Sequence, residues 1–445
     1  MVRTSVLGAA LLGAASVLAV DPPSCSLDKK CPKEMPCCSQ YGQCGVGAYC
    51  LGGCDPRMSY SLDSCLPAPV CKDKVYKMDS LDRYKDISEY LGDPKTADWV
   101  GQGEPLIYQG NTLLTMPPKS VGTVLATTTY MWYGSVRARL KTSRGRGVVT
   151  AFILYSDVKD EIDFEWVGVD LGTVQTNYYF QGIPNYTNTG NISISSNSYE
   201  DFHDYEIQWT PDEIRWLVDG KVGRVKKRSE TWNATANQWD FPQTPARVQI
   251  SIWPGGLETN AEGTINWAGG KIDWESDEIK NYGYYFATFA EVEVKCYRTD
   301  SPPGTNKGIS YYYTDYRATN DTVVDGNKST VIKSLLATGL DPTKGDPAKA
   351  SKSGSASAAE SSVFAIPGGG VGIGNPVPGS SSGSDGSSGS GTGTGRSSFC
   401  DGSSFSQDCT GGSDAGENAG VRGVRSGLGA SAFAVVVGIA GLLFL

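Results

Sequence analysis

Histidine and positive charge are scarce in this chain of 445 residues. His203 is the only histidine, and because catalytic triads and most zinc sites use histidine, the sequence argues against both kinds of site. Lysine and arginine number 39 against 48 aspartates and glutamates, which gives a net charge of −9. A chain this acidic is poorly suited to nucleic acid. We therefore expect a monomer with no metal, no cofactor and no nucleic-acid partner.

Long apolar runs are missing from the interior of the chain and occur only at its ends. Residues 1–19 begin with a charged Arg3, continue with an apolar stretch and end in a small-residue site at Ala19, which is typical of a secretory signal. A membrane-spanning helix is disfavoured, because the stretch is short and is ended by Pro22 and Pro23.

The second apolar run, residues 430–445, ends the chain and follows a polar spacer and a group of small residues. This order is the signal for a glycosylphosphatidylinositol (GPI) anchor. A true tail anchor is the alternative, but the run is short for a bilayer and no basic flank follows it. We expect Asn418 to carry the lipid, with Gly416 and Ser413 as alternatives, and residues 419–445 to be a propeptide.

Secretion predicts glycans and disulfides in this protein. Five N-glycosylation sequons are present, at Asn185, Asn191, Asn233, Asn320 and Asn327. The 12 cysteines should mostly form disulfides in an oxidising compartment. Nine of them lie between residues 25 and 71, so one needs a distant partner, and Cys296 is available. Cys400 and Cys409 could close a loop of their own, and the pairing cannot be deduced from sequence.

The run from Asp160 to Trp166 alternates acidic and bulky apolar residues. As a β-strand it places Glu161, Asp163 and Glu165 on one face and the apolar side chains on the other. Three neighbouring carboxylates repel one another, and Asp and Glu have a low preference for strands, so such a run is unfavourable. An acidic edge strand is the plain structural interpretation. The apolar opposite face and the apolar residues 147–154 instead favour a strand well inside a sheet, where a carboxylate pair serves as nucleophile and acid/base of a retaining glycosidase.

Residues 72–300 read as one all-β domain. Alternating runs separated by Gly, Pro, Asn and Asp predict strands at 135–141, 148–154, 161–167, 174–180, 205–210, 214–218, 247–253 and 283–297. Many strands with few helical stretches indicate a sandwich or barrel. We expect a short helix at residues 80–90. Residues 301–347 are predicted to be a partly packed extension, and residues 348–418, rich in Ser and Gly, a disordered stalk.

Residues 20–71 contain a cysteine-dense segment that cannot build an adequate core without disulfides. Its expected disulfide cysteines are Cys25, Cys31, Cys37, Cys38, Cys44, Cys50 and Cys54. The string from Cys37 to Gly45 (CCSQYGQCG) resembles the hevein-type chitin-binding module. That resemblance implies that Ser39, Tyr41 and Tyr49 bind N-acetylglucosamine, by an aromatic face on the sugar ring and an orienting hydroxyl. A purely structural disulfide knot is the alternative.

Three further stretches resemble glycoside hydrolase family 16 and, within it, the fungal Crh-type cell-wall transglycosylases. They are DEIDFEWVG from Asp160, FHDYEIQWTPDEIRW from Phe202, and SIWPGG from Ser251 with GTINWAGG from Gly263. The resemblance spans nearly all of residues 72–300. It implies a β-jelly-roll with a sugar-binding cleft on its concave sheet.

By position, the resemblance implies that Glu161 is the nucleophile, Glu165 the general acid/base and Asp163 the residue that assists the nucleophile. Because three close carboxylates cannot all ionise easily, one pKa should rise. For Trp166, which has the opposite parity, core packing is favoured.

The strand at 247–253 places Arg247, Gln249, Ser251 and Trp253 on one face. Family resemblance points to Gln249, Trp253 and, on a following strand, Thr264 as substrate-binding residues, with Tyr178 and Trp267 as weaker candidates.

The resemblance implies an enzyme that cuts chitin with retention and transfers the fragment to β-1,3- or β-1,6-glucan. It would act outside the cell while tethered to the plasma membrane or the wall. Three alternatives remain open at this point: a plain chitinase or endo-β-glucanase, a non-catalytic anchored lectin, and a structural wall mannoprotein.

Overall fold

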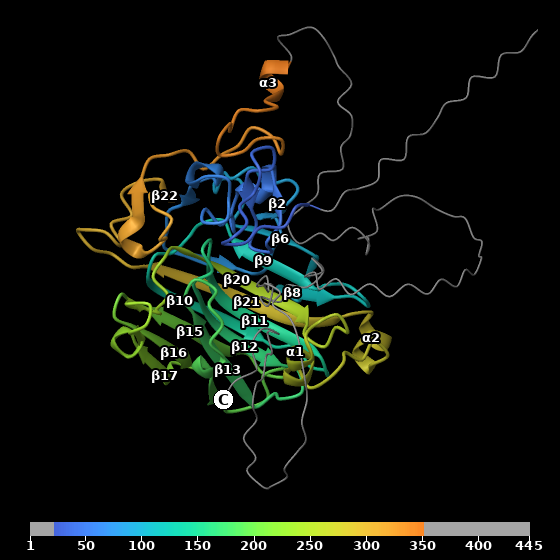
Figure 1. The fold of residues 1–445 in the computed structure, drawn as a ribbon. Coiled ribbons are helices and arrows are strands. Elements are labelled where there is room, and N and C mark those ends of the chain that lie inside the picture. Colours follow the sequence, from blue (N-terminus) through green and yellow to red (C-terminus); the bar gives the residue numbers. More distant parts are fainter. Residues whose placement is uncertain (1–21, 351–445) are drawn as a thin grey trace, which may run out of the picture.

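Two eight-stranded β-sheets packed against each other form the body of the protein (Figure 1). The computed structural model describes residues 22–350. The sheet that contains the acidic run, here called the acid-bearing sheet, has the strand order β14-β13-β12-β11-β20-β9-β6-β5. Its neighbouring strands are antiparallel except β5 and β6. Its strands are β5 Tyr84–Asp86, β6 Trp99–Gln102, β9 Thr123–Thr127, β11 Val148–Ser156, β12 Glu161–Val167, β13 Thr173–Tyr179, β14 Gly190–Ser193 and β20 Ala246–Pro254.

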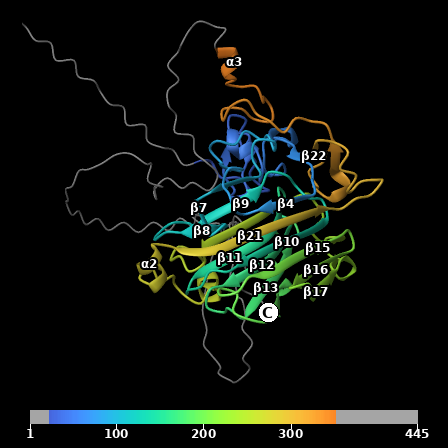
Figure 2. The ribbon, with the colours of Figure 1, turned by 180° about the vertical axis from the view of Figure 1, so that it is seen from behind.

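The second sheet, here called the partner sheet, covers the other side of the core and has the order β17-β16-β15-β10-β21-β8-β7, with β4 paired to β21. Figure 2 shows its strands from behind in this order. They are β4 Lys74–Lys77, β7 Glu104–Tyr108, β8 Asn111–Met116, β10 Gly134–Lys141, β15 His203–Trp209, β16 Glu213–Val218, β17 Lys221–Lys227 and β21 Tyr285–Cys296. All eight predicted strands are present, and the prediction of an all-β jelly-roll is confirmed.

Aromatic side chains fill the space between the sheets. Phe164 and Trp166 of β12 are buried, and their rings stack at a centroid distance of 5.9 Å. Trp166 meets Tyr205 of the partner sheet edge-on at 4.5 Å, which confirms that Trp166 packs in the core. Each such side chain contributes roughly 1.5–3 kcal/mol by leaving water. The apolar face of β12 therefore holds the strand in place while its acidic face points away from the core.

The helix predicted at residues 80–90 is wrong. The chain there forms turns and β5, whose residues Tyr84 and Asp86 pair in parallel with Trp99 and Gly101. The Asp86 carboxylate accepts the backbone N–H of Ser88 at 2.8 Å, a local contact that favours a turn over a helix. Pairing with β6, the next strand along the chain, has overridden the local helical preference.

Short helices and hairpins complete the described residues. The helices are α1 Glu262–Trp267, α2 Asp277–Tyr282 and α3 Pro347–Ala350. The five 3₁₀ turns are Gly47–Cys50, Leu62–Ser64, Tyr186–Asn188, Arg228–Glu230 and Asn320–Thr322. The remaining strands are β1 Cys37–Cys38, β2 Cys44–Gly45, β3 Ala68–Pro69, β18 Trp232–Asn233, β19 Gln238–Trp239, β22 Ser310–Tyr313 and β23 Val323–Gly326.

All seven predicted disulfide cysteines are bonded, and so are three others. The pairs are Cys25–Cys38, Cys31–Cys44, Cys37–Cys50, Cys54–Cys65 and Cys71–Cys296. The last pair joins the end of the cysteine-dense segment to β21, as the odd count predicted. The segment lies beside β6 and β9 in Figure 1, and β22 of residues 301–347 pairs with β3.

The sequence signals at both ends lie outside the described residues. These are the secretory signal at 1–19, the stalk beyond residue 350, Cys400 and Cys409, the lipid site Asn418 and the propeptide at 419–445. Within residues 22–350, no helix is long and apolar enough to cross a membrane.

Candidate active site

The three acids share one face of β12, and strand register aligns them with residues of β11 and, beyond it, of β20. Glu161 lies opposite Tyr155 of β11, and Tyr155 lies opposite Arg247 of β20. Two positions along, Asp163 and Gln249 flank Ile153 in the same way. Glu165 and Ser251 flank Ala151 one step further. Since directly paired residues share a face, the acids, Gln249 and Trp253 lie on one side of the acid-bearing sheet, as predicted.

Asp163 is the most deeply buried of the three acids. Its exposure is 2%, against 5% for Glu161, and Glu165 is half-buried. Burial raises the pKa of Asp163 to about 7, while the charge of Arg224 and the backbone N–H of Asn177 lower it. The expected rise in one pKa is thus present. It falls on the middle acid, and its main cause is loss of water rather than repulsion between carboxylates.

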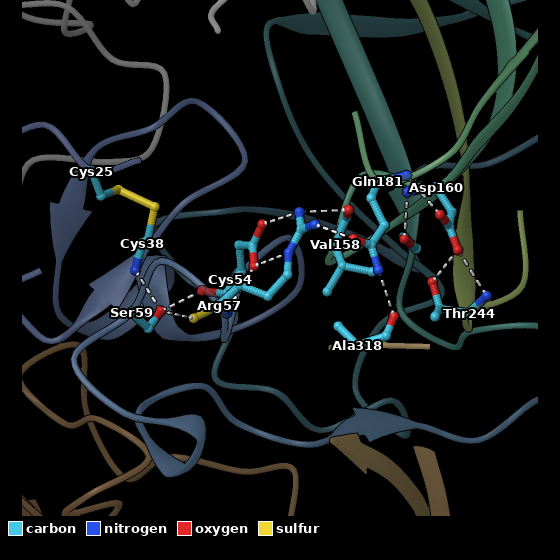
Figure 3. A network of polar contacts seen from close by, with 12 residues as sticks. Cys25, Cys38, Cys54, Arg57, Ser59, Val158, Asp160, Gln181, Thr244 and Ala318 are labelled. Atoms are coloured by element: carbon cyan, nitrogen blue, oxygen red, sulfur yellow. Dashed lines mark hydrogen bonds and ion pairs between the residues drawn. A yellow bond between two sulfur atoms is a disulfide. The ribbon is translucent and has the colours of Figure 1, made fainter. Parts of the chain in front are cut away.

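Asp160 fixes the start of the acidic strand, a role that the sequence did not reveal. Its buried carboxylate accepts hydrogen bonds from the backbone N–H groups of Gln181, Gln243 and Thr244 at 2.8, 2.9 and 3.0 Å, and from the Thr244 hydroxyl at 2.7 Å (Figure 3). Several donors of this kind stabilise a buried carboxylate. Asp160 therefore joins β12 to the ends of β13 and β20, next to the Glu161 position.

Two tryptophans border the acid face near Glu165, at the opposite end of β12 from Asp160. Trp253 of β20, opposite Val149, stacks on Trp267 at a centroid distance of 5.9 Å and an angle of 26°. The Trp267 indole N–H donates to Gln175 at 2.7 Å, and Gln175 lies opposite Glu165. Both tryptophans thus belong to the neighbourhood of Glu165.

The expectation that Thr264 lies on a strand is wrong. Thr264 is 1% exposed and sits in the first turn of α1, whose end at Trp267 and Ala268 packs against Val149 and Trp253. The Gly263–Gly270 stretch lacks the alternation of a strand, and this was the available signal.

Tyr178 is not on the acid face, which corrects its assignment to the substrate. It lies opposite Ile162, is 3% exposed and belongs to the core between the sheets. Its neighbours Asn177 and Tyr179, opposite Asp163 and Glu161, lie on the acid face together with Gln175. The register between two strands cannot be read from one sequence, and a shift by one residue exchanges the faces.

The three residues predicted to bind sugar in the cysteine-dense segment differ in how deeply they are buried. Tyr49 is 2% exposed and packs with Tyr90 and Val100 of the domain, so it cannot stack on a sugar, which corrects that expectation. Ser39 is buried and Tyr41 is half-buried. All three line a hollow between this segment and the acid-bearing sheet.

The five sequons lie on the surface or partly buried, and Asn191 of β14 lies opposite Gln175, in the row of Glu165. Asn185, Asn191 and Asn327 are exposed, and Asn233 and Asn320 are half-buried. His203 begins β15 of the partner sheet, where its ring contacts Asp219 at 2.8 Å and Ser196 at 3.1 Å. These contacts give it a structural role.

Comparison with known proteins agrees with this geometry. Residues 93–269 match the glycosyl hydrolases family 16. The chain is 60% identical to Crh-like protein 3 of Botryotinia fuckeliana over 348 residues, which cover 78% of this chain and 77% of that protein. The chain belongs to the Crh-like proteins. The prediction that it is an enzyme of the retaining glycosidase type is thereby confirmed.

More distant Crh-like relatives span a similar part of the chain. Crh-like protein UTR2 of Candida albicans is 48% identical, with 74% of this chain and 72% of that protein covered. Congo red hypersensitive protein 2 of Saccharomyces cerevisiae is 46% identical, with 72% and 69% covered. Among solved structures, the Crh5 transglycosylase in complex with NAG is similar at 26% identity and a TM-score of 0.48, covering 58% of this chain and 95% of that chain.

Proposed function

We propose that this Crh-like protein cleaves chitin with retention and transfers the fragment that stays bound to the enzyme to β-1,3- or β-1,6-glucan. The observation that carries the proposal is the row of three carboxylates on one face of β12, in a buried sheet, with a raised pKa at Asp163. The names of its relatives, which include a Crh5 transglycosylase, support the choice of reaction.

In the first half-reaction, a carboxylate oxygen of Glu161 attacks the anomeric carbon of the donor, and the glycosidic C–O bond breaks. Glu165 donates its proton to the leaving oxygen, so the reducing-side fragment departs with a hydroxyl. Asp163 lies between them along the strand, and its pKa of about 7 keeps it mostly protonated below neutral pH, where it can donate a hydrogen bond to the Glu161 carboxylate.

In the second half-reaction, Glu165 takes the proton of an incoming hydroxyl while that oxygen attacks the anomeric carbon and displaces Glu161. A glucan hydroxyl gives the transfer product, and water gives hydrolysis. Gln249, Trp253 and Trp267 share the acid face or border it and would hold the sugar units. An aromatic pair beside a polar row suits sugar rings, which are apolar on their faces and polar at their edges.

The protein would act at the cell surface, retained by a lipid anchor at Asn418. Such a tether, together with a segment that resembles a chitin-binding module, suits an enzyme that joins two insoluble polymers of the fungal wall. Glycans at the exposed Asn185, Asn191 and Asn327 are compatible with this location.

The test is incubation of chitin oligomers with labelled laminari-oligosaccharides. A labelled hybrid product that fails to form with Glu161→Gln would support transfer. Shortened chitin fragments without a labelled hybrid would show a hydrolase instead, and binding without any turnover of the wild type would favour a lectin.

A further inference from the structure

The cysteine-dense segment is packed onto the acid-bearing sheet rather than held apart from it. The backbone N–H of Gly53 donates to the Asp157 carboxylate at 2.8 Å, and the buried Arg57 donates to the Val158 carbonyl at 2.7 Å and to Gln181 at 3.0 Å. Figure 3 shows how this network reaches the residues around Asp160. Tyr49, Leu51 and Leu66 add an apolar contact with Val100 and Ala126.

Two glycines allow this contact to be close. A Cβ atom on Gly52 would lie 2.6 Å from the Arg247 guanidinium, and one on Gly53 would lie 2.7 Å from the Gln40 amide oxygen. The same oxygen accepts a hydrogen bond from Arg247 Nη2 at 3.3 Å. The Arg247 side chain is thus packed between its own sheet and the segment.

A hollow lies between the cysteine-dense segment and the acid-bearing sheet, next to Arg247. From the segment, Ser39, Gln40 and Tyr41 line it, and from the sheet, Gln102, Arg247 and Gln249 line it. Arg247 and Gln249 are 7% and 5% exposed. Arg247 Nε and Gln249 Nε2 have no hydrogen-bond partner among residues 22–350. Buried donors without a partner are costly, so an oxygen acceptor, from water or from a bound sugar, would complement both donors.

The hollow adjoins the acids. Gln249 is separated from Asp163 by one strand, so the two backbones lie about 10 Å apart, which is two inter-strand spacings. Tyr41 lines the hollow, and it is also among the groups near Tyr155: burial raises the pKa of Tyr155 well above its ordinary value, and Glu161, Asp55 and Tyr41 raise it further. Tyr155 is the direct partner of Glu161.

We propose that the cysteine-dense segment is one wall of the catalytic cleft, and that Gln40 and Tyr41 hold a sugar unit of the polysaccharide together with Arg247 and Gln249. The sugar's hydroxyl or acetamido oxygen would accept from the two unpartnered donors, and its ring would lie against Tyr41. This subsite rests on the proposed function, since it adjoins the acids of that reaction. The segment would then contribute to turnover of dissolved oligomers and would not be a separate chitin-binding unit.

The test uses the full chain in two forms, the active protein and an inactive Glu161→Gln background. In the inactive background, calorimetry with a long chitin oligomer should show one oligomer bound per chain. Gln40→Ala and Tyr41→Ala should each weaken binding about 3–10-fold, and in the active protein they should raise KM by a similar factor. Tyr41→Phe keeps the ring and should bind nearly as wild type. Tyr60→Ala removes an aromatic ring of the same segment that is 44% exposed, and should change neither quantity.

Two oligomers per chain, with Tyr41→Ala removing one of them and leaving KM unchanged, would show an independent binding unit and overturn the shared subsite. Unchanged binding in both alanine variants would overturn it as well. A wild type that binds but does not turn over would refute the proposed reaction, while the binding measurements would still decide the subsite.

Discussion

Replacing Asp163 with asparagine should make the protein more stable and less active, with a pH dependence fixed by one pKa. An ordinary aspartate titrates at 3.8, and burial raises the pKa of Asp163 to about 7. Between these values the unfolded chain releases this proton and the native state retains it. The native state then binds more protons, so its stability falls as the pH rises.

The size of the effect follows from the two pKa values. A pKa difference of one unit corresponds to about 1.36 kcal/mol. The difference between the ordinary and the native pKa of Asp163 therefore lowers the free energy of unfolding by ~4 kcal/mol once the pH is above 7. Asp163→Asn does not titrate and avoids this cost. The free energy of unfolding of the variant, relative to wild type, should therefore rise by up to ~4 kcal/mol between pH 4 and pH 8.

The assay is guanidinium unfolding of both proteins, with disulfides intact, at several pH values across this range. Glu258→Gln, which changes an exposed carboxylate paired with Lys271, is the control and should leave the pH dependence unchanged between pH 5 and 8. Turnover of Asp163→Asn should fall by about 10²-fold. A stability difference from wild type that stays constant from pH 4 to pH 8 would refute the raised pKa.

Three further predictions concern the acid/base, the segment contact and metals. Glu165→Gln should lose turnover by about 10²–10⁴-fold. With an activated donor, whose leaving group needs no proton, azide should attack the glycosyl-enzyme in place of the acceptor and give a glycosyl azide; failure of azide with that donor would count against the covalent scheme. Arg57→Ala should lower the free energy of unfolding by ~3–5 kcal/mol, because it leaves the buried Asp55 charge unpaired. The control is Arg317→Ala, which removes an arginine paired in the same way with an aspartate two residues earlier, but at the surface, and should cost at most ~1 kcal/mol. Equal costs for the two variants would contradict this expectation. Dialysis against EDTA should leave activity unchanged, and a loss that calcium restores would show a metal requirement.

The alternation of β12 made its two faces predictable, because strand parity is a local property. Glu161, Asp163 and Glu165 could be placed on one face and Trp166 in the core from the sequence alone. The neighbours of these acids could not be placed, since they depend on register. Tyr178 and Tyr179 are adjacent in the chain, and only the pairing of β13 with β12 decides which of them lies on the acid face.

The contacts of the cysteine-dense segment were beyond prediction for a related reason. The disulfides and the need for Cys296 as a partner follow from counting cysteines. The burial of Tyr49 against Tyr90 and Val100, and the contact of Arg247 with Gln40, 207 residues away, arise from docking between separate parts of the chain, and no local sequence pattern indicates such docking. The structural role of Asp160 could not be predicted either, because the sequence does not distinguish a carboxylate that accepts backbone N–H groups from the other acids of the run.

The most direct test of the central claim is to trap the glycosyl-enzyme. Glu165→Gln, which should slow its breakdown, would be mixed with an activated chitin-oligosaccharide donor, quenched with acid, digested and analysed by mass spectrometry. We expect a sugar ester on Glu161, which disappears in the Glu161→Gln/Glu165→Gln double variant. A sugar ester on another residue, or release of product by the active wild type with no ester on Glu161 in the trapped variant, would contradict this expectation.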